Sequence, residues 1–93
     1  MATVLAGAPS CGRPLEVEEC RRLLDRYTEL LVLEEQPGAQ PSQVARAQAE
    51  ARVVAREDPR FEFSSCSRRV SRASYDCAMS AHGVDEMERC LVF

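Results

Sequence analysis

Apolar residues recur with helical spacing between residues 14 and 35. They fall at i, i+3, i+4 and i+7, and so lie on one face of a helix: Cys20, Leu23, Leu24, Tyr27, Leu30 and Leu31. Pro14 suits a first helical turn, where its missing N–H costs nothing, and three glutamates within residues 16–19 place negative charge at the positive end of the helix dipole. Two prolines and a glycine in residues 36–41 end the segment. The pattern predicts a helix that begins at Pro14.

A second periodic segment covers residues 42–58, and its buried face is mostly alanine. The inward positions are Val44, Ala47, Ala51, Val54 and Ala55. This helix is expected to start near Ser42, just after Pro41, and to end at Asp58. Because small side chains allow a partner helix to approach closely, the two segments are expected to form an antiparallel hairpin.

Two shorter helices are expected in the C-terminal third. The first spans residues 71–82 and is predicted to bury one stripe: Val70, Ala73, Cys77, Ala78 and Ala81. The second follows Gly83, has Asp85 and Glu86 in its first turn, and turns four residues inward: Val84, Met87, Cys90 and Leu91. The expected fold class is therefore all-α, with two longer antiparallel helices and a shorter C-terminal helical hairpin. Residues 14–93 form one domain, and residues 1–13 precede it.

Composition limits the class of function. With 93 residues there is room for one core, and 45% hydrophobic against 29% charged residues is a globular balance. A net charge of −3 lacks the electrostatic footprint of a nucleic-acid binder, so no nucleic-acid partner is expected. All 12 basic residues are arginine, and Lys, Asn and Ile are absent, which indicates a GC-rich genome. No apolar run is long enough for a transmembrane helix.

Five cysteines in 93 residues favour an oxidising compartment and disulfide bonds. Zinc is an alternative, held by Cys77, His82 and Cys90, although the cysteines lie at least nine positions apart and lack the usual close pairs. Reduced cysteines buried in the core are a second alternative. Disulfide bonds, with no metal site, are the preferred interpretation.

The geometry of the two hairpins predicts which cysteines pair. Around His82 and Gly83, Cys77 lies about six positions back and Cys90 about seven forward, so the two face each other. Around Gly38, Cys20 lies as far back as the end of the second helix lies forward, so that Cys66 emerges beside the first helix. The predicted bonds are Cys20–Cys66 and Cys77–Cys90, with Cys11 left over.

The first 12 residues are small and apolar and resemble the end of a signal peptide. Ser10 suits the position before a lipoprotein cysteine, so Cys11 is a candidate for lipidation and for the only membrane contact. The alternative is a plain flexible N-terminus with a native start upstream of Met1.

Aromatic and basic residues between the two hairpins are candidates for binding a partner. Phe61 and Phe63 cap the open end of the core or form a partner-binding patch. The candidate basic cluster follows: Arg68, Arg69 and Arg72. These side chains pair with the acidic start of the first helix (Glu16, Glu18 and Glu19) or bind an acidic protein, a lipid headgroup or a phosphate.

Two short motifs compete with the disulfide interpretation. The last four residues, 90–93, fit the prenylation pattern at Cys90, and Arg68 and Arg69 precede Ser71 as in a basophilic kinase site. Catalytic chemistry has little support, because a single histidine and scattered carboxylates provide no converging acid–base or nucleophile partners. No enzyme activity and no cofactor are expected.

The segment from Ser71 to Leu91, with Cys77, His82 and Cys90, resembles the C-terminal part of small cysteine-containing helical proteins from myxobacteria and related GC-rich bacteria, many of them described as lipoproteins. The similarity extends back to about Leu15, and the matching cysteines recur at the four paired positions. The resemblance implies an envelope location, periplasmic or outer-membrane-associated, and disulfide bonding. We therefore expect a noncatalytic protein-interaction or structural module, on its own or as a subunit of a larger assembly. The alternative is a cytosolic regulatory adaptor with reduced cysteines.

Overall fold

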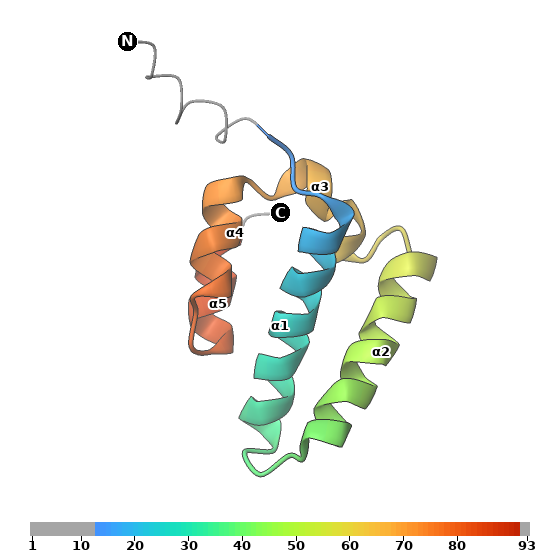
Figure 1. Cartoon of the computed structure of the whole chain (residues 1–93), viewed down its shortest axis with the longest axis vertical. Helices are drawn as coiled ribbons and strands as arrows, with labels where there is room; N and C mark the ends of the chain where they lie inside the picture. Colours follow the sequence, from blue (N-terminus) through green and yellow to red (C-terminus); the bar gives the residue numbers. More distant parts are fainter. Residues whose placement is uncertain (1–12, 92–93) are drawn as a thin grey trace.

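The computed structural model describes residues 13–91, which are all-helical and contain no strand. The elements follow in the order α1 (Val17–Glu35), α2 (Pro41–Glu57), the 3-10 helix η2 (Glu62–Ser65), α3 (Cys66–Arg69), α4 (Arg72–Met79) and α5 (Val84–Cys90). Helix α1 lies between α2 on one side and the α4–α5 hairpin on the other (Figure 1), and it packs against all four other α-helices. The predicted all-α fold with its antiparallel pair is confirmed.

Capping boxes set the starts of the two long helices. In α1 the Glu16 side chain accepts from the backbone of the third helical residue, and the Glu16 N–H donates to Glu19 Oε1 over 2.9 Å. In α2, Gln40 and Gln43 form the same reciprocal pair, with a Gln40 N–H to Oε1 distance of 2.7 Å. Helix α1 therefore begins three residues after the predicted Pro14, because the box fixes the boundary, whereas α2 begins at Pro41, one residue before the predicted start near Ser42.

The connection after α2 contains two helical turns that periodicity did not predict. η2 and α3 turn Phe63 and Cys66 inward, and both side chains are buried. The Ser64 hydroxyl lies 2.7 Å from the Ala55 carbonyl oxygen and 2.8 Å from that of Asp58, which ties this connection to the end of α2. Four-residue helices are too short to show a 3.6-residue period.

Helix α4 is shorter than predicted, and three of the five residues predicted to be buried in this segment are buried: Val70, Ala78 and Ala81. It ends at Met79 rather than His82, and it buries Tyr75 and Ala78. Ala73 and Cys77, predicted to be buried, are exposed. Each lies two residues from Tyr75, about 200° around the helix, and so points to the opposite side.

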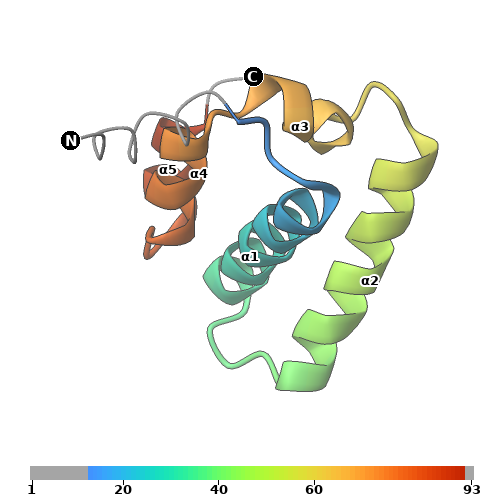
Figure 2. The same ribbon diagram turned by 45° about the horizontal axis from the view of Figure 1, so that its top comes forward.

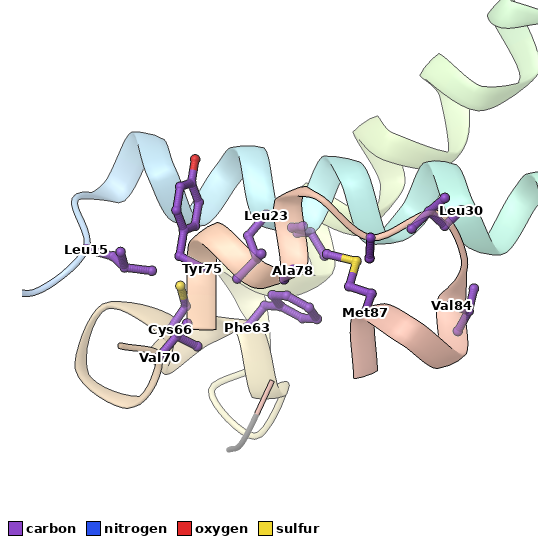
Figure 3. Close-up of a cluster of buried hydrophobic side chains, with 12 residues drawn as sticks. Leu15, Leu23, Leu30, Phe63, Cys66, Val70, Tyr75, Ala78, Val84 and Met87 are labelled. Carbon is purple, nitrogen blue, oxygen red and sulfur yellow. The ribbon is translucent and has the colours of Figure 1, made fainter. Parts of the chain in front are cut away.

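The core lies between α1 and the C-terminal half of the chain. Figure 3 shows Leu23, Ala78 and Met87 close together at its centre, and none of the three has any exposed surface. The other buried apolar residues are Leu15, Leu24, Leu30, Phe63, Cys66, Val70, Tyr75, Ala81 and Val84. The only buried polar side chain of the described residues, Thr28, donates to the Leu24 carbonyl over 2.9 Å. Helix α2 contributes no fully buried residue.

Helix α2 is therefore held against α1 by polar contacts as well as by its half-buried alanines. Arg52 donates to both carboxylate oxygens of Asp25, over 3.0 and 2.7 Å, and Gln48 donates to the Asp25 backbone carbonyl over 3.0 Å. A two-pronged guanidinium–carboxylate contact fixes orientation as well as distance. Asp25 thus joins α1 to α2 at one defined position along both helices.

Both predicted disulfides are present. Cys20–Cys66 joins α1 to α3 with a Cα–Cα distance of 5.9 Å, and Cys77–Cys90 joins α4 to α5 with 5.7 Å. The zinc site at Cys77, His82 and Cys90 and the reduced core cysteines are therefore wrong for this structure, because the four sulfurs are bonded to one another.

Removing either disulfide should destabilise the fold, and the longer loop should matter more. The bonds close loops with sequence separations of 46 and 13 residues. In a Cys11→Ser background, Cys20→Ala with Cys66→Ala should lower the free energy of unfolding by about 4 kcal/mol, and Cys77→Ala with Cys90→Ala by about 3 kcal/mol. Urea titrations followed by circular dichroism measure both. A Cys20/Cys66 variant as stable as its parent would contradict the prediction.

The two disulfides should also differ in their rates of reduction. Cys77 is exposed, whereas Cys66 has 1% of its surface exposed. An attacking thiolate must reach a sulfur atom, so limiting dithiothreitol should open Cys77–Cys90 first. Alkylation at successive times and peptide mass spectrometry measure the order. Equal rates of reduction at the two bonds would show that the exposure of the cysteines does not control the order of reduction.

Candidate functional site

A cleft of about 500 Å³ opens where the N-terminal half of α1, the C-terminal half of α2 and the η2–α3 turn meet. Figure 2 shows this end of the molecule, where α3 lies across the space between the start of α1 and the end of α2. Val17, Leu24, Ala55 and Phe63 provide its apolar wall, beside the Cys20–Cys66 disulfide. We call it the arginine-rimmed cleft, after three further lining residues: Arg21, Arg52 and Arg56.

The wall of this cleft is continuous with the core. Phe63 and Leu24 have 7% and 4% of their surfaces exposed, and both belong to the buried cluster. Val17 differs, because 77% of its surface is exposed at the start of α1. The cleft therefore combines a rigid apolar floor with an uncovered apolar side chain at its mouth.

The rim of the cleft is positively charged, and the residues lining it include no carboxylate. Arg52 is bound to Asp25, and this hydrogen-bonded contact raises the pKa of Arg52 above its usual value. Arg21 lies 3.6 Å from Glu18 in an exposed ion pair, which is a weak contact. Arg56 forms no ion pair with any of residues 13–91.

A second, smaller cleft of about 400 Å³ has the opposite charge. Tyr27, Phe63 and Leu91 line it together with Glu62 and Glu88. The Tyr27 hydroxyl donates to Glu88 Oε2 over 2.7 Å, and the rings of Tyr27 and Phe63 are 5.4 Å apart. Burial, and then the bond to Glu88, raise the pKa of Tyr27 to about 12, so the phenol stays protonated and donates at neutral pH.

The two phenylalanines predicted as a cap or a partner patch occupy different environments. Phe63 is buried and borders both clefts. Phe61 is half-buried and packs on it, with ring centroids 5.7 Å apart. Phe63 therefore contributes to the core and to the cleft walls together.

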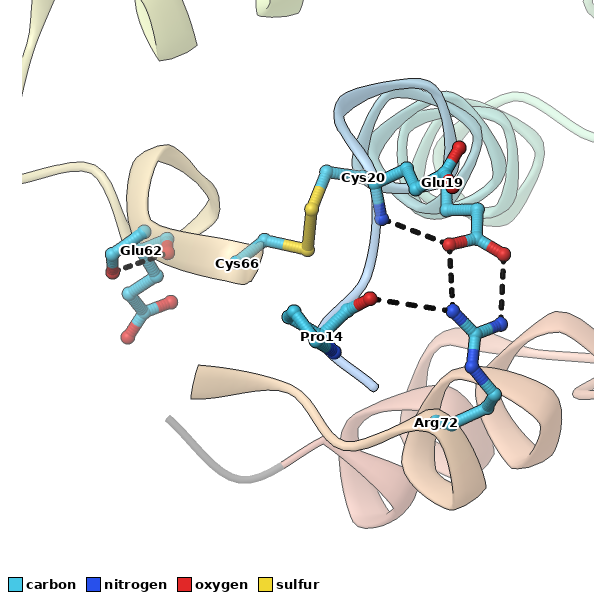
Figure 4. Close-up of a disulfide and its surroundings, with 8 residues drawn as sticks. Pro14, Glu19, Cys20, Glu62, Cys66 and Arg72 are labelled. Atoms are coloured by element: carbon cyan, nitrogen blue, oxygen red, sulfur yellow. Dashed lines mark hydrogen bonds and ion pairs between the residues drawn. A yellow bond between two sulfur atoms is a disulfide. The ribbon is translucent and has the colours of Figure 1, made fainter. Parts of the chain in front are cut away.

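The predicted basic cluster divides into two parts. Arg72 binds both carboxylate oxygens of Glu19, over 2.8 and 2.9 Å, and also reaches the Pro14 carbonyl at 3.4 Å (Figure 4). The predicted pairing with the acidic start of α1 is thus confirmed for this residue. Arg68 and Arg69 are exposed on α3.

The Glu19–Arg72 pair joins the start of α1 to α4 and is mostly shielded from solvent. The side chains are 18% and 17% exposed. The hydrogen bonds from Arg72, and then the bond from the Glu16 backbone, lower the pKa of Glu19 from 4.5 to about 2. The carboxylate is therefore ionised at neutral pH and remains so in moderately acidic solution.

Sequence reasoning missed the rim arginines. Arg52 and Arg56 are spaced i, i+4 on α2, and this spacing alone indicates that both lie on the same face of the helix. Arg21 joins them from α1, and that meeting depends on how the two helices pack.

The remaining sequence candidates carry no site chemistry in the described part of the chain. No group of three or more His, Cys, Asp or Glu residues within 13–91 could hold a metal ion, and His82 is exposed. None of the described helices has the length and apolar character needed to cross a membrane. Ser71 caps α4 by accepting from the Ser74 N–H over 3.0 Å. Cys11, Val92 and Phe93 lie outside the described residues.

No family model, curated protein or solved structure matches this chain. The resemblance to small myxobacterial cysteine-containing proteins therefore stays a prediction. Fold and surface of residues 13–91 therefore define the class of protein: a small disulfide-linked helical domain that carries open clefts of opposite charge.

Acid should weaken the fold through Glu19. Its pKa is lowered in the folded state, so its contribution to stability is complete above pH 4.5 and is lost as pH falls towards 2. Glu19→Gln should therefore be less stable than the parent at pH 7, and the difference should vanish near pH 2. Urea titrations across this range measure it. Glu34→Gln, at an exposed position, is the matched control and should keep the parent's pH profile.

Proposed function

We propose that the protein is a noncatalytic protein-interaction module of an oxidising compartment, the bacterial cell envelope. The observation that carries this proposal is the pair of disulfides, which join all of the cysteines among residues 13–91. Such bonds persist in the periplasm and outside the cell, whereas cytosolic thiols are kept reduced. The resemblance to envelope proteins of GC-rich bacteria agrees with this location.

The thin core supports the same proposal. Helix α2 buries no side chain fully, so the hydrophobic contribution comes mainly from α1 and the C-terminal half. Small domains of this kind commonly depend on covalent cross-links for stability. A cytosolic protein with this core would lack that contribution.

Binding is supported over catalysis by the groups around the larger cleft. Its lining comprises arginine, serine, cystine and apolar side chains, with no histidine or carboxylate to act as a base. The Ser64 hydroxyl, which borders the cleft, is engaged with two backbone carbonyl oxygens. These groups can bind a partner by charge and apolar contact, and they provide no route for proton transfer.

The thiol state inside the source cells tests the compartment. Cells are quenched in acid, free thiols are blocked with N-ethylmaleimide, and the disulfides are then reduced and labelled with iodoacetamide. Mass spectrometry should find the second label on Cys20, Cys66, Cys77 and Cys90, while a cytosolic protein from the same cells carries the first label. The first label on these four cysteines would favour the cytosolic adaptor instead.

A further inference from the structure

We propose that the arginine-rimmed cleft receives an acidic segment of a partner protein, which inserts one large apolar side chain between α1 and α2. This inference rests on the proposed interaction function and names the chemistry of its partner.

The apolar part of the cleft accounts for the inserted side chain. Leu24, Ala55 and Phe63 form a wall held in place by the core, and the volume of about 500 Å³ is within the range of binding pockets. Val17 is 77% exposed at the mouth of the cleft, so an inserted apolar side chain can bury part of its surface. Central apolar anchors in such pockets commonly dominate the affinity of protein interfaces.

The charged part accounts for the acidic flanks. Arg21 extends from α1 and Arg56 from α2, so the two guanidinium groups border the cleft from opposite helices. Arg52 is already bound to Asp25, whereas Arg56 has no ion pair among residues 13–91 and Arg21 has only its exposed contact with Glu18. Two carboxylates of an incoming chain, one on each side of the apolar anchor, complement this arrangement.

The openness of the cleft favours a protein segment over a small molecule. Val17, Arg21, Arg56 and Ser64 are all exposed at the rim. Small-molecule sites bury most of their ligand, and this cleft would leave one side of such a ligand in water. The chain's own residues 1–12 contain no charged side chain and therefore do not match the arginines.

Two synthetic peptides test the proposal on the oxidised full chain labelled with ¹⁵N. The acidic peptide has 14 residues, a central Leu-Phe pair and four flanking glutamates, and the basic peptide has lysines in their place. The acidic peptide should shift the amide signals of Val17, Leu24, Ala55 and Ser64, and should bind at least tenfold more tightly than the basic peptide.

Matched variants locate the interaction. Arg21→Gln with Arg56→Gln should weaken binding of the acidic peptide at least tenfold. Arg46→Gln with Arg89→Gln changes the net charge equally at exposed positions outside the cleft and should leave the affinity unchanged. Circular dichroism checks that both double variants stay folded.

The disulfide beside the cleft provides a second readout. Bound acidic peptide should slow the reduction of Cys20–Cys66 and leave the rate at Cys77–Cys90 unchanged, because only the first bond borders the cleft. Equal affinity for the two peptides, or signal shifts away from the cleft, would overturn the proposal. If dodecanoate binds at the same arginines more tightly than the acidic peptide does, the proposal is overturned in favour of a small amphiphile. Self-association detected by sedimentation, without peptide binding, would overturn it in favour of a second copy of the chain. None of these results depends on the thiol state in cells, so failure here leaves the proposed compartment standing.

Discussion

The packing of the four other α-helices against α1 is the constraint on which this structure depends. The helix supplies Leu23, Leu24 and Leu30 to a core that α2 does not enter with any fully buried side chain. Its first two turns also carry the cross-links: Cys20 is bonded to Cys66, and Glu19 to Arg72. These two neighbouring residues anchor α3 and α4, respectively. The start of α1 is therefore a covalent and ionic junction. Elsewhere, Asp25 binds Arg52 of α2, the Cys77–Cys90 bond joins α4 to α5, and hydrophobic burial adds to both.

Ion pairing separates the arginines into structural and available groups. Arg52 and Arg72 each engage a carboxylate through two hydrogen bonds and hold one helix against another. Their charges are compensated, and replacing either arginine would lower the free energy of unfolding. Arg56 has no such carboxylate in the described part of the chain, so its charge is directed to solvent at the cleft rim. Exposed charge of this kind contributes to recognition more than to folding.

The long helices and both disulfides could be predicted from sequence because they depend on simple regularities. Helical periodicity is visible over 17 or 19 residues, and a hairpin places residues equally distant from its turn side by side. The burial of Tyr75 in α4 could not be predicted in the same way, because the opposite side of this eight-residue helix carries Ala73 and Cys77, whose small side chains also suit a core. Tyr75 took the position that Cys77 was expected to occupy. The arginine-rimmed cleft was invisible for a different reason, since it joins residues of three separate elements.

The arrangement of the two disulfides along the chain has a topological consequence. One covalent ring runs from Cys20 to Cys66 and the other from Cys77 to Cys90, so the rings follow each other without overlap or nesting. Neither bond has to thread through the other, and either can form first. The smaller ring brings its ends together at lower entropic cost. Oxidation can thus proceed as two separate closures, in either order, without one ring obstructing the other.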